Sequence, residues 1–162
     1  MTSHQIQSVN IVQAETDAQV SAAKVLFREY EAWLGLDLCF QGFEEELAHL
    51  PGKYARPDGR LFLAYSGDRI AGCAALRKLE DGVCEMKRLF VRDEFRGLKV
   101  GIRLIERLID DAREIGYRTL RLDTFPPKMG KAVSLYESLG FRQIQPYYDN
   151  PNDGVLFMEL AL

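Results

Sequence analysis

The stretch that decides the fold is Cys84–Gly116, CEMKRLFVRDEFRGLKVGIRLIERLIDDAREIG. It begins with an apolar run typical of a buried strand and ends with a helix whose apolar residues recur every 3.6 residues. Between them lies the basic turn 96–101, RGLKVG. Its glycines allow close backbone approach, and the first turn of a helix carries N–H groups without an intrahelical acceptor. These donors, the helix dipole, Arg96 and Lys99 together predict an anion site, of which phosphate is the usual occupant.

The composition is that of an ordinary globular protein, with 162 residues, 47% hydrophobic content and a net charge of -3. We expect one domain over 1–162. A clustered basic excess, as in nucleic-acid-binding proteins, is missing, and no apolar run is long enough to span a membrane. The polar N-terminus does not resemble a signal peptide. Cys39, Cys73 and Cys84 form no CxxC motif or Cys/His cluster, so we predict reduced thiols, no metal site and a cytoplasmic location.

The order of predicted elements is β-α-α-β-β-β-α-β-α-β-β. Besides the central helix, helices are predicted over 18–34, capped by Asp17, over 43–50 and over 126–139. Besides the central strand, strands are predicted over 6–13, 60–65, 69–78, 117–124, 141–145 and 155–162. Short turns join the second, third and fourth strands into an antiparallel meander, whereas strand–helix–strand over 84–124 predicts a parallel pair. The sequence therefore predicts an α/β fold with a central mixed antiparallel and parallel sheet flanked by helices.

A second motif, AVSLYESLGF over 132–141, follows the basic turn. With that turn it resembles the GNAT superfamily of acyl-coenzyme A-dependent N-acyltransferases, over nearly the whole chain. The family signature is Arg or Gln, two residues, Gly, one residue, then Gly or Ala. Arg96 and Gly101 match it, and Lys99 replaces the middle Gly. The second motif is similar to the family's AxxLYxxxGF, while Met129 stands where the family often has Asn.

The resemblance implies a GNAT-like fold and transfer of an acetyl group from acetyl-CoA to a primary amine of a small molecule or peptide, by direct attack and without a metal. The pantetheine arm would pair with the strand before the turn, and the pyrophosphate would sit on the amides that open the helix. The implied acetyl-CoA positions are Leu89, Phe90, Val91, Arg96, Gly97, Leu98, Lys99, Val100, Gly101 and Ile102. From the residues alone, the strand is equally a core strand and the turn equally a solvated, charged cap.

Two residues are candidates for acid–base catalysis. Tyr136 falls on the family's tyrosine and would protonate the leaving thiolate; the alternative is a tyrosine packed in the core. Glu85 lies eleven residues before Arg96, where some family members place the general base. A period of two predicts that Glu85, Lys87, Leu89 and Val91 share one face of their strand. The alternative for Glu85 is an ion pair with Lys87 or an arginine.

The family builds its acceptor pocket from the first two helices and from loops near the fourth strand and the C-terminus. The candidates here are Tyr30, Trp33, Phe40, Arg88, Tyr147 and the adjacent Tyr148. Aromatic residues placed like Tyr30 and Trp33 are more often plain core residues. A non-catalytic acyl-CoA-binding or sensing domain stays open because of Lys99 and Met129, whereas a Rossmann domain is disfavoured because no GxGxxG follows the first strand. Exposed sheet edges are compatible with a homodimer.

Overall fold

The structure is a computed structural model that describes residues 8–38 and 42–162. The elements in chain order are β1 (Val9–Gln13), α1 (Asp17–Leu34), α2 (Phe43–Ala48), the 3-10 helix η2 (Gly52–Tyr54), β2 (Arg60–Ser66), β3 (Arg69–Glu80), β4 (Val83–Val91), the 3-10 helix η3 (Asp93–Phe95), α3 (Val100–Ile115), β5 (Thr119–Thr124), α4 (Pro126–Ser138), β6 (Arg142–Ile144) and β7 (Leu156–Ala161). Apart from the two short 3-10 helices, this is the predicted order, and most boundaries lie within two residues of the prediction.

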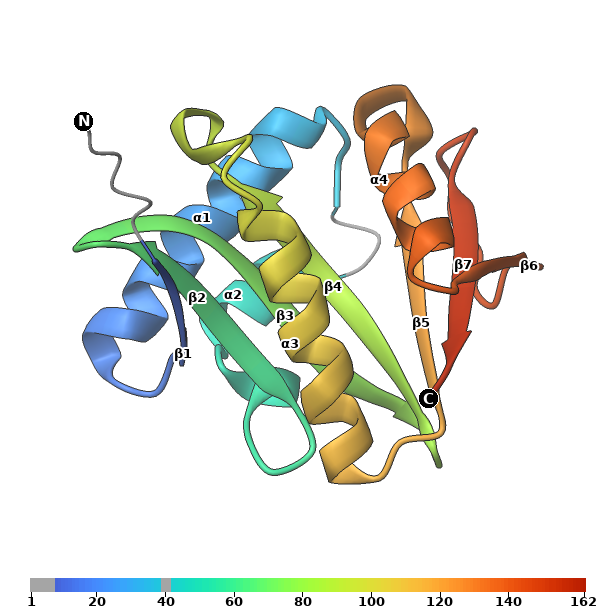
Figure 1. Ribbon diagram of the computed structural model, residues 1–162, viewed down its shortest axis with the longest axis horizontal. Coiled ribbons are helices and arrows are strands. Elements are labelled where there is room, and N and C mark those ends of the chain that lie inside the picture. The colour runs from blue at the N-terminus through green and yellow to red at the C-terminus, as the bar shows by residue number, and fades with distance from the viewer. Residues whose placement is uncertain (1–7, 39–41) are drawn as a thin grey trace.

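One mixed sheet forms the centre of the molecule, with strand order β1-β2-β3-β4-β5-β7-β6. β4 and β5 are parallel, and the other neighbours are antiparallel, as the meander and the crossover predicted. Helices α1 and α2 cover one face, and α3 and α4 cover the other (Figure 1). The predicted mixed α/β architecture is confirmed.

The two faces of the sheet have separate cores. The predicted apolar stripe of α3 is confirmed, because Val100, Leu104, Ile105, Leu108 and Ala112 are all at most 1% exposed. They pack with the inward side chains of β3, β5 and β7. On the other face, the apolar residues of α1 and α2 pack against β2 and β3. The sheet is therefore held rigidly from both sides, and a site on it is positioned by both cores.

The N-terminus of α1 corrects one prediction. The cap is Thr16 and not Asp17, which is the first helical residue. The Thr16 hydroxyl accepts from the N–H of Gln19 at 3.1 Å, and the Gln19 side chain accepts from the N–H of Thr16 at 3.1 Å. This reciprocal capping box satisfies two backbone donors, whereas a cap at Asp17 would leave the Thr16 hydroxyl unused.

Two of the three cysteines lie in the described part of the chain. Cys73 and Cys84 are free and buried, while Cys39 lies outside the described residues. Within the described ranges, none of the helices combines the length and apolarity needed to cross a membrane.

Candidate active site

β4 and β5 diverge, which opens the sheet near its centre. Their pairing covers only Val83–Glu85 against Thr119–Arg121, although β4 continues to Val91 and β5 to Thr124. Figure 1 shows the two strands close together at one end and apart at the end where α4 begins. Beyond Glu85, β4 has no strand on its β5 side among the described residues. Its backbone edge can therefore pair with an extended ligand.

A β-bulge in β4 lies at this opening. Cys73 of β3 pairs with Phe90, and Ala75 pairs with Lys87, so β4 carries one residue more than β3 over this stretch. Arg88 takes the left-handed conformation, with φ of 59°, which is uncommon outside glycine. An inserted residue shifts the alternation of all side chains that follow it.

The bulge overturns the prediction that Glu85, Lys87, Leu89 and Val91 share one face. Leu89 and Val91 pack against the core beside α3, whereas Glu85 and Lys87 line a groove on the face of α2. Phe90 packs in the core beside α1. The prediction assumed a period of two without an inserted residue. It therefore placed the residues after Arg88 on the opposite face of the sheet from the one that they occupy.

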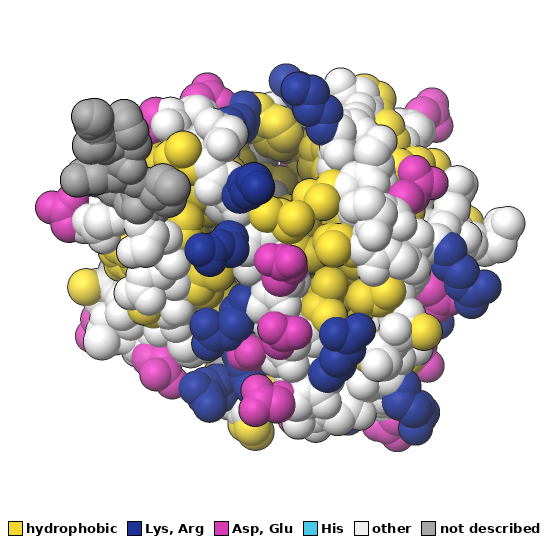
Figure 2. Space-filling model, viewed as in Figure 1, with side chains coloured by type: hydrophobic (Ala, Val, Ile, Leu, Met, Phe, Trp, Pro, Cys, Tyr) yellow, Lys and Arg dark blue, Asp and Glu magenta, His cyan; other side chains and the backbone are white. Residues whose placement is uncertain are grey.

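The basic turn ends at the N-terminus of α3. Lys99 is the N-cap with φ of 62°, and no side chain caps the helix. The N–H of Arg103 bonds to the carbonyl of Lys99 at 3.1 Å, so the N–H groups of 99–102 have no intrahelical acceptor. Figure 2 shows a hollow over the space between α3 and α4, with hydrophobic atoms inside it and Lys and Arg side chains at its rim. The geometry therefore favours a ligand with an anionic and an apolar part.

Arg96 is held within the turn. Its Nε donates to the carbonyl of Val91 at 3.2 Å, and its guanidinium pairs with Asp93 at 2.5 Å. The guanidinium also lies over the ring of Trp33, 5.0 Å from the centroid. Trp33 in turn packs against Phe90, with ring centroids 6.0 Å apart. These contacts brace the turn against α1, and the backbone amides and Lys99 are left as the donors for an anion.

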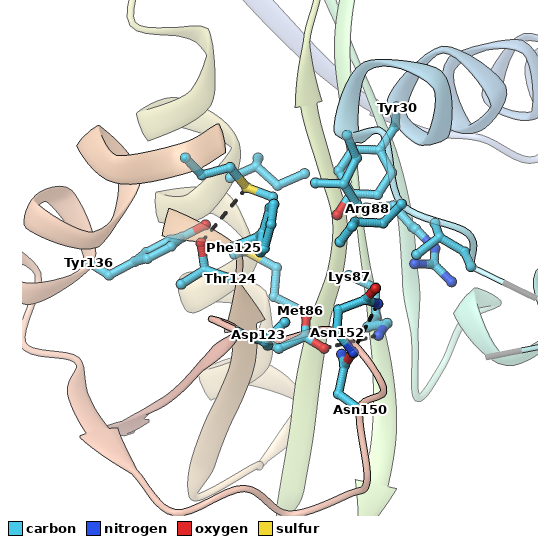
Figure 3. Close-up of a pocket in the computed structure, with 16 residues that line it drawn as sticks. Tyr30, Met86, Lys87, Arg88, Asp123, Thr124, Phe125, Tyr136, Asn150 and Asn152 are labelled. Atoms are coloured by element: carbon cyan, nitrogen blue, oxygen red, sulfur yellow. Dashed lines mark hydrogen bonds and ion pairs between the residues drawn. The ribbon is translucent and has the colours of Figure 1, made fainter. Parts of the chain in front are cut away.

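A cavity lies between the diverging strands (Figure 3). Tyr136 projects into it from α4, is 3% exposed and packs on Phe141 with centroids 5.5 Å apart. Within the part of the chain that the structure describes, its hydroxyl makes no hydrogen bond. Burial raises the pKa of Tyr136, so the phenol stays protonated at neutral pH. The ring therefore packs in the core while the hydroxyl faces the cavity, and the role of Tyr136 as an acid stays a prediction.

A larger groove of about 820 Å³ lies on the face of α2. Its floor is formed by Arg77, Glu85 and Lys87 of β3 and β4, one wall by α2 and η2, and the other wall by Tyr147 and its neighbours. Lys87 and Arg88 line both the groove and the cavity between the strands. The groove therefore leads to the opening in the sheet from the face opposite α3.

Glu85 is buried on the floor of this groove, with its side chain 1% exposed. The Nε of Arg77 lies 2.8 Å from one carboxylate oxygen, and the hydroxyl of Tyr147 donates to the other at 2.6 Å. Burial and the negative charge of Glu85 raise the pKa of Tyr147. Of the alternatives for Glu85, the ion pair with an arginine is present, and the role of base stays a prediction.

A second carboxylate with a tyrosine partner lies nearby, and the sequence reasoning missed it. Asp123, near the end of β5, accepts a hydrogen bond from the hydroxyl of Tyr148. The amide nitrogen of Asn150 also donates to that hydroxyl, at 2.9 Å, and the ammonium of Lys87 lies 3.8 Å from Asp123. The sequence signal that could have pointed to Asp123 is an acidic residue at the end of a strand that lines an opening in the sheet.

The remaining predicted acceptor residues differ in their surroundings. Tyr30 lines the cavity between the strands and packs edge-on against Phe90, with centroids 6.2 Å apart. Arg88 is 4% exposed and forms a two-point ion pair with Glu46 of α2, at 2.9 and 3.0 Å. Phe40 lies outside the described residues. Among the described residues, no group of three or more His, Cys, Asp or Glu side chains could hold a metal ion.

Comparison with known proteins identifies the family. The sequence model of the Acetyltransferase (GNAT) family matches residues 24–141, and the chain belongs to this family. It is 37% identical to an uncharacterized N-acetyltransferase of Dictyostelium discoideum, covering 95% of this chain and 99% of that protein. It is 41% identical to an uncharacterized N-acetyltransferase of Schizosaccharomyces pombe, covering 86% of each. An acetyltransferase structure from Streptococcus agalactiae 2603 superimposes with a TM-score of 0.78 at 23% identity, covering 96% and 99%. The protein is thus a GNAT-type acyltransferase.

Proposed function

We propose that the protein transfers an acetyl group from acetyl-CoA to a primary amine by direct attack. The observation that carries this proposal is the continuity of three features: the uncapped N-terminus of α3, the unpaired edge of β4 and the hydroxyl of Tyr136 in the cavity between the strands. An anionic diphosphate, an extended pantetheine arm and an acyl thioester match these features in that order. The family of the chain supports the same donor.

The residues of this chain fit acetyl-CoA. The amides of 97–102 and the Lys99 ammonium would hold the diphosphate, with Arg96 bracing their turn. The backbone of 89–91 would pair with the pantetheine arm, and one of its N–H groups would polarise the thioester carbonyl. The bulge at Arg88 supports this role, because it redirects the strand at the opening.

Acetyl-CoA supplies an acetyl group already activated as a thioester, and the protein supplies position and protons. Tyr136 holds a proton on its phenolic oxygen for the sulfur that leaves. The acceptor amine would reach the opening through the groove of α2, past Tyr147, with Arg88 and Tyr30 where groove and cavity meet. Glu85 is a candidate base through water, although its two oxygens already bind Arg77 and Tyr147.

Acetyl-CoA should raise the melting temperature of the protein. At a ligand concentration a hundred times Kd, binding stabilises the folded state by about 2.7 kcal/mol, which corresponds to roughly 5–11 °C for a chain of this size. Differential scanning fluorimetry measures the shift. Gly101→Glu is the matched variant: a Cβ there meets only the side chain of Val91, at 3.7 Å, while the new carboxylate repels a diphosphate. No shift with the wild-type protein at saturating acetyl-CoA would contradict the proposal.

A non-catalytic acyl-CoA sensor is the alternative that the sequence left open, because Lys99 stands where the family pattern has glycine. The family of the chain argues against it. The release of free thiol from acetyl-CoA, measured with a panel of amines, amino acids, polyamines and peptides, separates the two candidates. Binding of acetyl-CoA without thiol release for any acceptor would favour the sensor.

We also propose that the enzyme acts in the cytoplasm. The support is that Cys73 and Cys84 are free thiols inside the two cores, as expected of a protein kept in a reducing compartment. The edge strands β1 and β6 are the surfaces through which two copies could pair.

A further inference from the structure

We propose that Asp123, and not Glu85, accepts the proton of the acceptor amine. This inference rests on the proposed acetyl transfer and adds the identity of the base. Three observations carry it: the face of the sheet on which Asp123 lies, its distance along the strand from the closed end of the opening, and a carboxylate oxygen that accepts no hydrogen bond from the described residues.

The first observation is that Asp123 lies on the face of the sheet opposite α3. Side chains alternate along β5, and Leu120 and Leu122 pack into the core beside α3. Asp123 therefore lies on the opposite face, as its contacts with Lys87 and Tyr148 of the groove confirm. Tyr136 approaches from the α4 side of the sheet. An acid for the sulfur and a base for the amine thus lie on opposite faces, which suits a donor and an acceptor that meet in the opening.

The second observation is the position along the strand. The last pair between β4 and β5 is Glu85 with Arg121, so Glu85 lies at the closed end of the opening. A strand rises about 3.3 Å per residue, which places Asp123 roughly 7 Å further toward the open end. Asp123 lines the cavity into which Tyr136 projects, whereas Glu85 lines the groove and not this cavity.

The third observation is the availability of the carboxylate. Both oxygens of Glu85 are bonded, and its side chain is 1% exposed. Asp123 is 19% exposed, and its contacts with Tyr148 and Lys87 both involve the oxygen Oδ2. Within the described ranges, Oδ1 accepts no hydrogen bond from another residue. Figure 3 shows Asp123 beside Asn150 and Asn152 at the edge of the cavity, where Oδ1 can receive a proton from an ammonium group.

Several ionisable side chains surround Asp123 and hold it in place. Its negative charge contributes to raising the pKa of Tyr30 and Tyr136 across the cavity, after the larger effect of their burial. It raises the pKa of Tyr148 in the same way, so Tyr148 stays a hydrogen-bond donor. The ionisable groups that face Asp123 from the neighbouring elements are Lys87, Arg88, Glu85, Tyr30, Tyr136, Tyr147 and Tyr148.

The ammonium form of the acceptor gives one proton to Asp123, and its lone pair then forms the bond between nitrogen and the acyl carbon. When the bond between carbon and sulfur breaks, its electron pair stays on sulfur, which takes the proton of Tyr136. The second proton lost by the nitrogen restores the Tyr136 hydroxyl through solvent, and Asp123 returns its proton to water. The products are the N-acetylated amine, the free thiol and one proton.

The test compares Asp123→Asn, Glu85→Gln and the exposed surface control Asp110→Asn. Asparagine keeps an oxygen for Tyr148 but loses the charge. The acceptor is the member of the amine panel that wild type acetylates fastest, and kcat/KM is measured from pH 6 to 10. We expect Asp123→Asn to lower kcat/KM about 100-fold or more near neutral pH, within the range of general-base catalysis. The loss should shrink toward high pH, where the amine is neutral without a base. Glu85→Gln should lose less than Asp123→Asn, and Asp110→Asn should match wild type.

A second readout does not depend on turnover. Calorimetric titration of the same amine into protein without acetyl-CoA should show at least tenfold weaker binding to Asp123→Asn than to Asp110→Asn, since the ammonium loses its anionic partner. Asp123→Asn with wild-type activity, or with a loss that is constant over pH, would overturn the proposal, as would a larger pH-dependent loss in Glu85→Gln. If wild type shows an acetyl-CoA melting shift but acetylates no amine, the proposed function fails, and this inference fails with it. If all variants keep the melting shift and wild type acetylates the amine, the proposed function stands, and the rates of the variants test the assignment of Asp123 alone.

Discussion

Replacing Tyr136 by phenylalanine should lower kcat by roughly one to three orders of magnitude while the Kd for acetyl-CoA stays near that of wild type. The ring packs on Phe141 in both proteins, so the fold and the wall of the cavity are preserved. What is lost is the only proton donor that the mechanism assigns to the leaving sulfur. Steady-state thiol release gives kcat, and calorimetric titration gives the Kd.

The matched control for this change is Tyr117→Phe. The hydroxyl of Tyr117 donates to the carbonyl of Asp58, outside both cavities, so its loss should leave kcat unchanged. Because burial raises the pKa of Tyr136, wild-type kcat should not decline with rising pH until above the ordinary tyrosine value of about 10. Equal values of kcat for Tyr136→Phe and wild type would remove Tyr136 from its role.

Replacing Arg88 by methionine should lower the free energy of unfolding by about 3–5 kcal/mol, the cost of leaving one partner of a buried ion pair alone. The side chain of Arg88 is 2% exposed and that of Glu46 is 16% exposed, so Glu46 would keep a poorly solvated charge. Urea unfolding at pH 7 measures the change. Adding Glu46→Gln to Arg88→Met should recover part of the loss, because the unpaired charge is then removed.

Arg28→Met is the matched control for the stability measurement. Arg28 also makes a two-point ion pair with a glutamate of α2, Glu44, and also lies over the ring of Phe43. Its side chain is 52% exposed, however, and that of Glu44 is 62% exposed. Exposed pairs contribute little because water screens them, so Arg28→Met should change the free energy far less. Similar losses for the two variants would show that burial of Arg88 is not the cause.

The fold could be predicted from the sequence because its signals are local. The period of α3, the short turns of the meander and the two motifs each depend on neighbouring residues, and the structure confirms their order. The cap of α1 was missed by one residue because Thr16 and Asp17 are both good caps. Only the reciprocal bond with Gln19 decides between them.

The site could be predicted only in part, because its geometry depends on pairing between distant residues. The bulge at Arg88 is defined by the register against β3, which the sequence of β4 alone does not contain. The partner of Glu85 is Arg77, directly opposite on β3. The sequence therefore predicted that an arginine could pair with Glu85, but not which arginine. The contact between Asp123 and Tyr148 joins β5 to a loop 25 residues later, and no local sequence pattern predicts it.

The decisive measurement is a crystal structure of the protein with acetyl-CoA. We predict that the diphosphate lies on the backbone amides of 97–102, that the pantetheine arm runs along β4 at 89–91, and that the sulfur lies within hydrogen-bonding distance of the Tyr136 hydroxyl. Crystals soaked at saturating ligand with nothing bound at the start of α3, or with the sulfur remote from Tyr136, would contradict it.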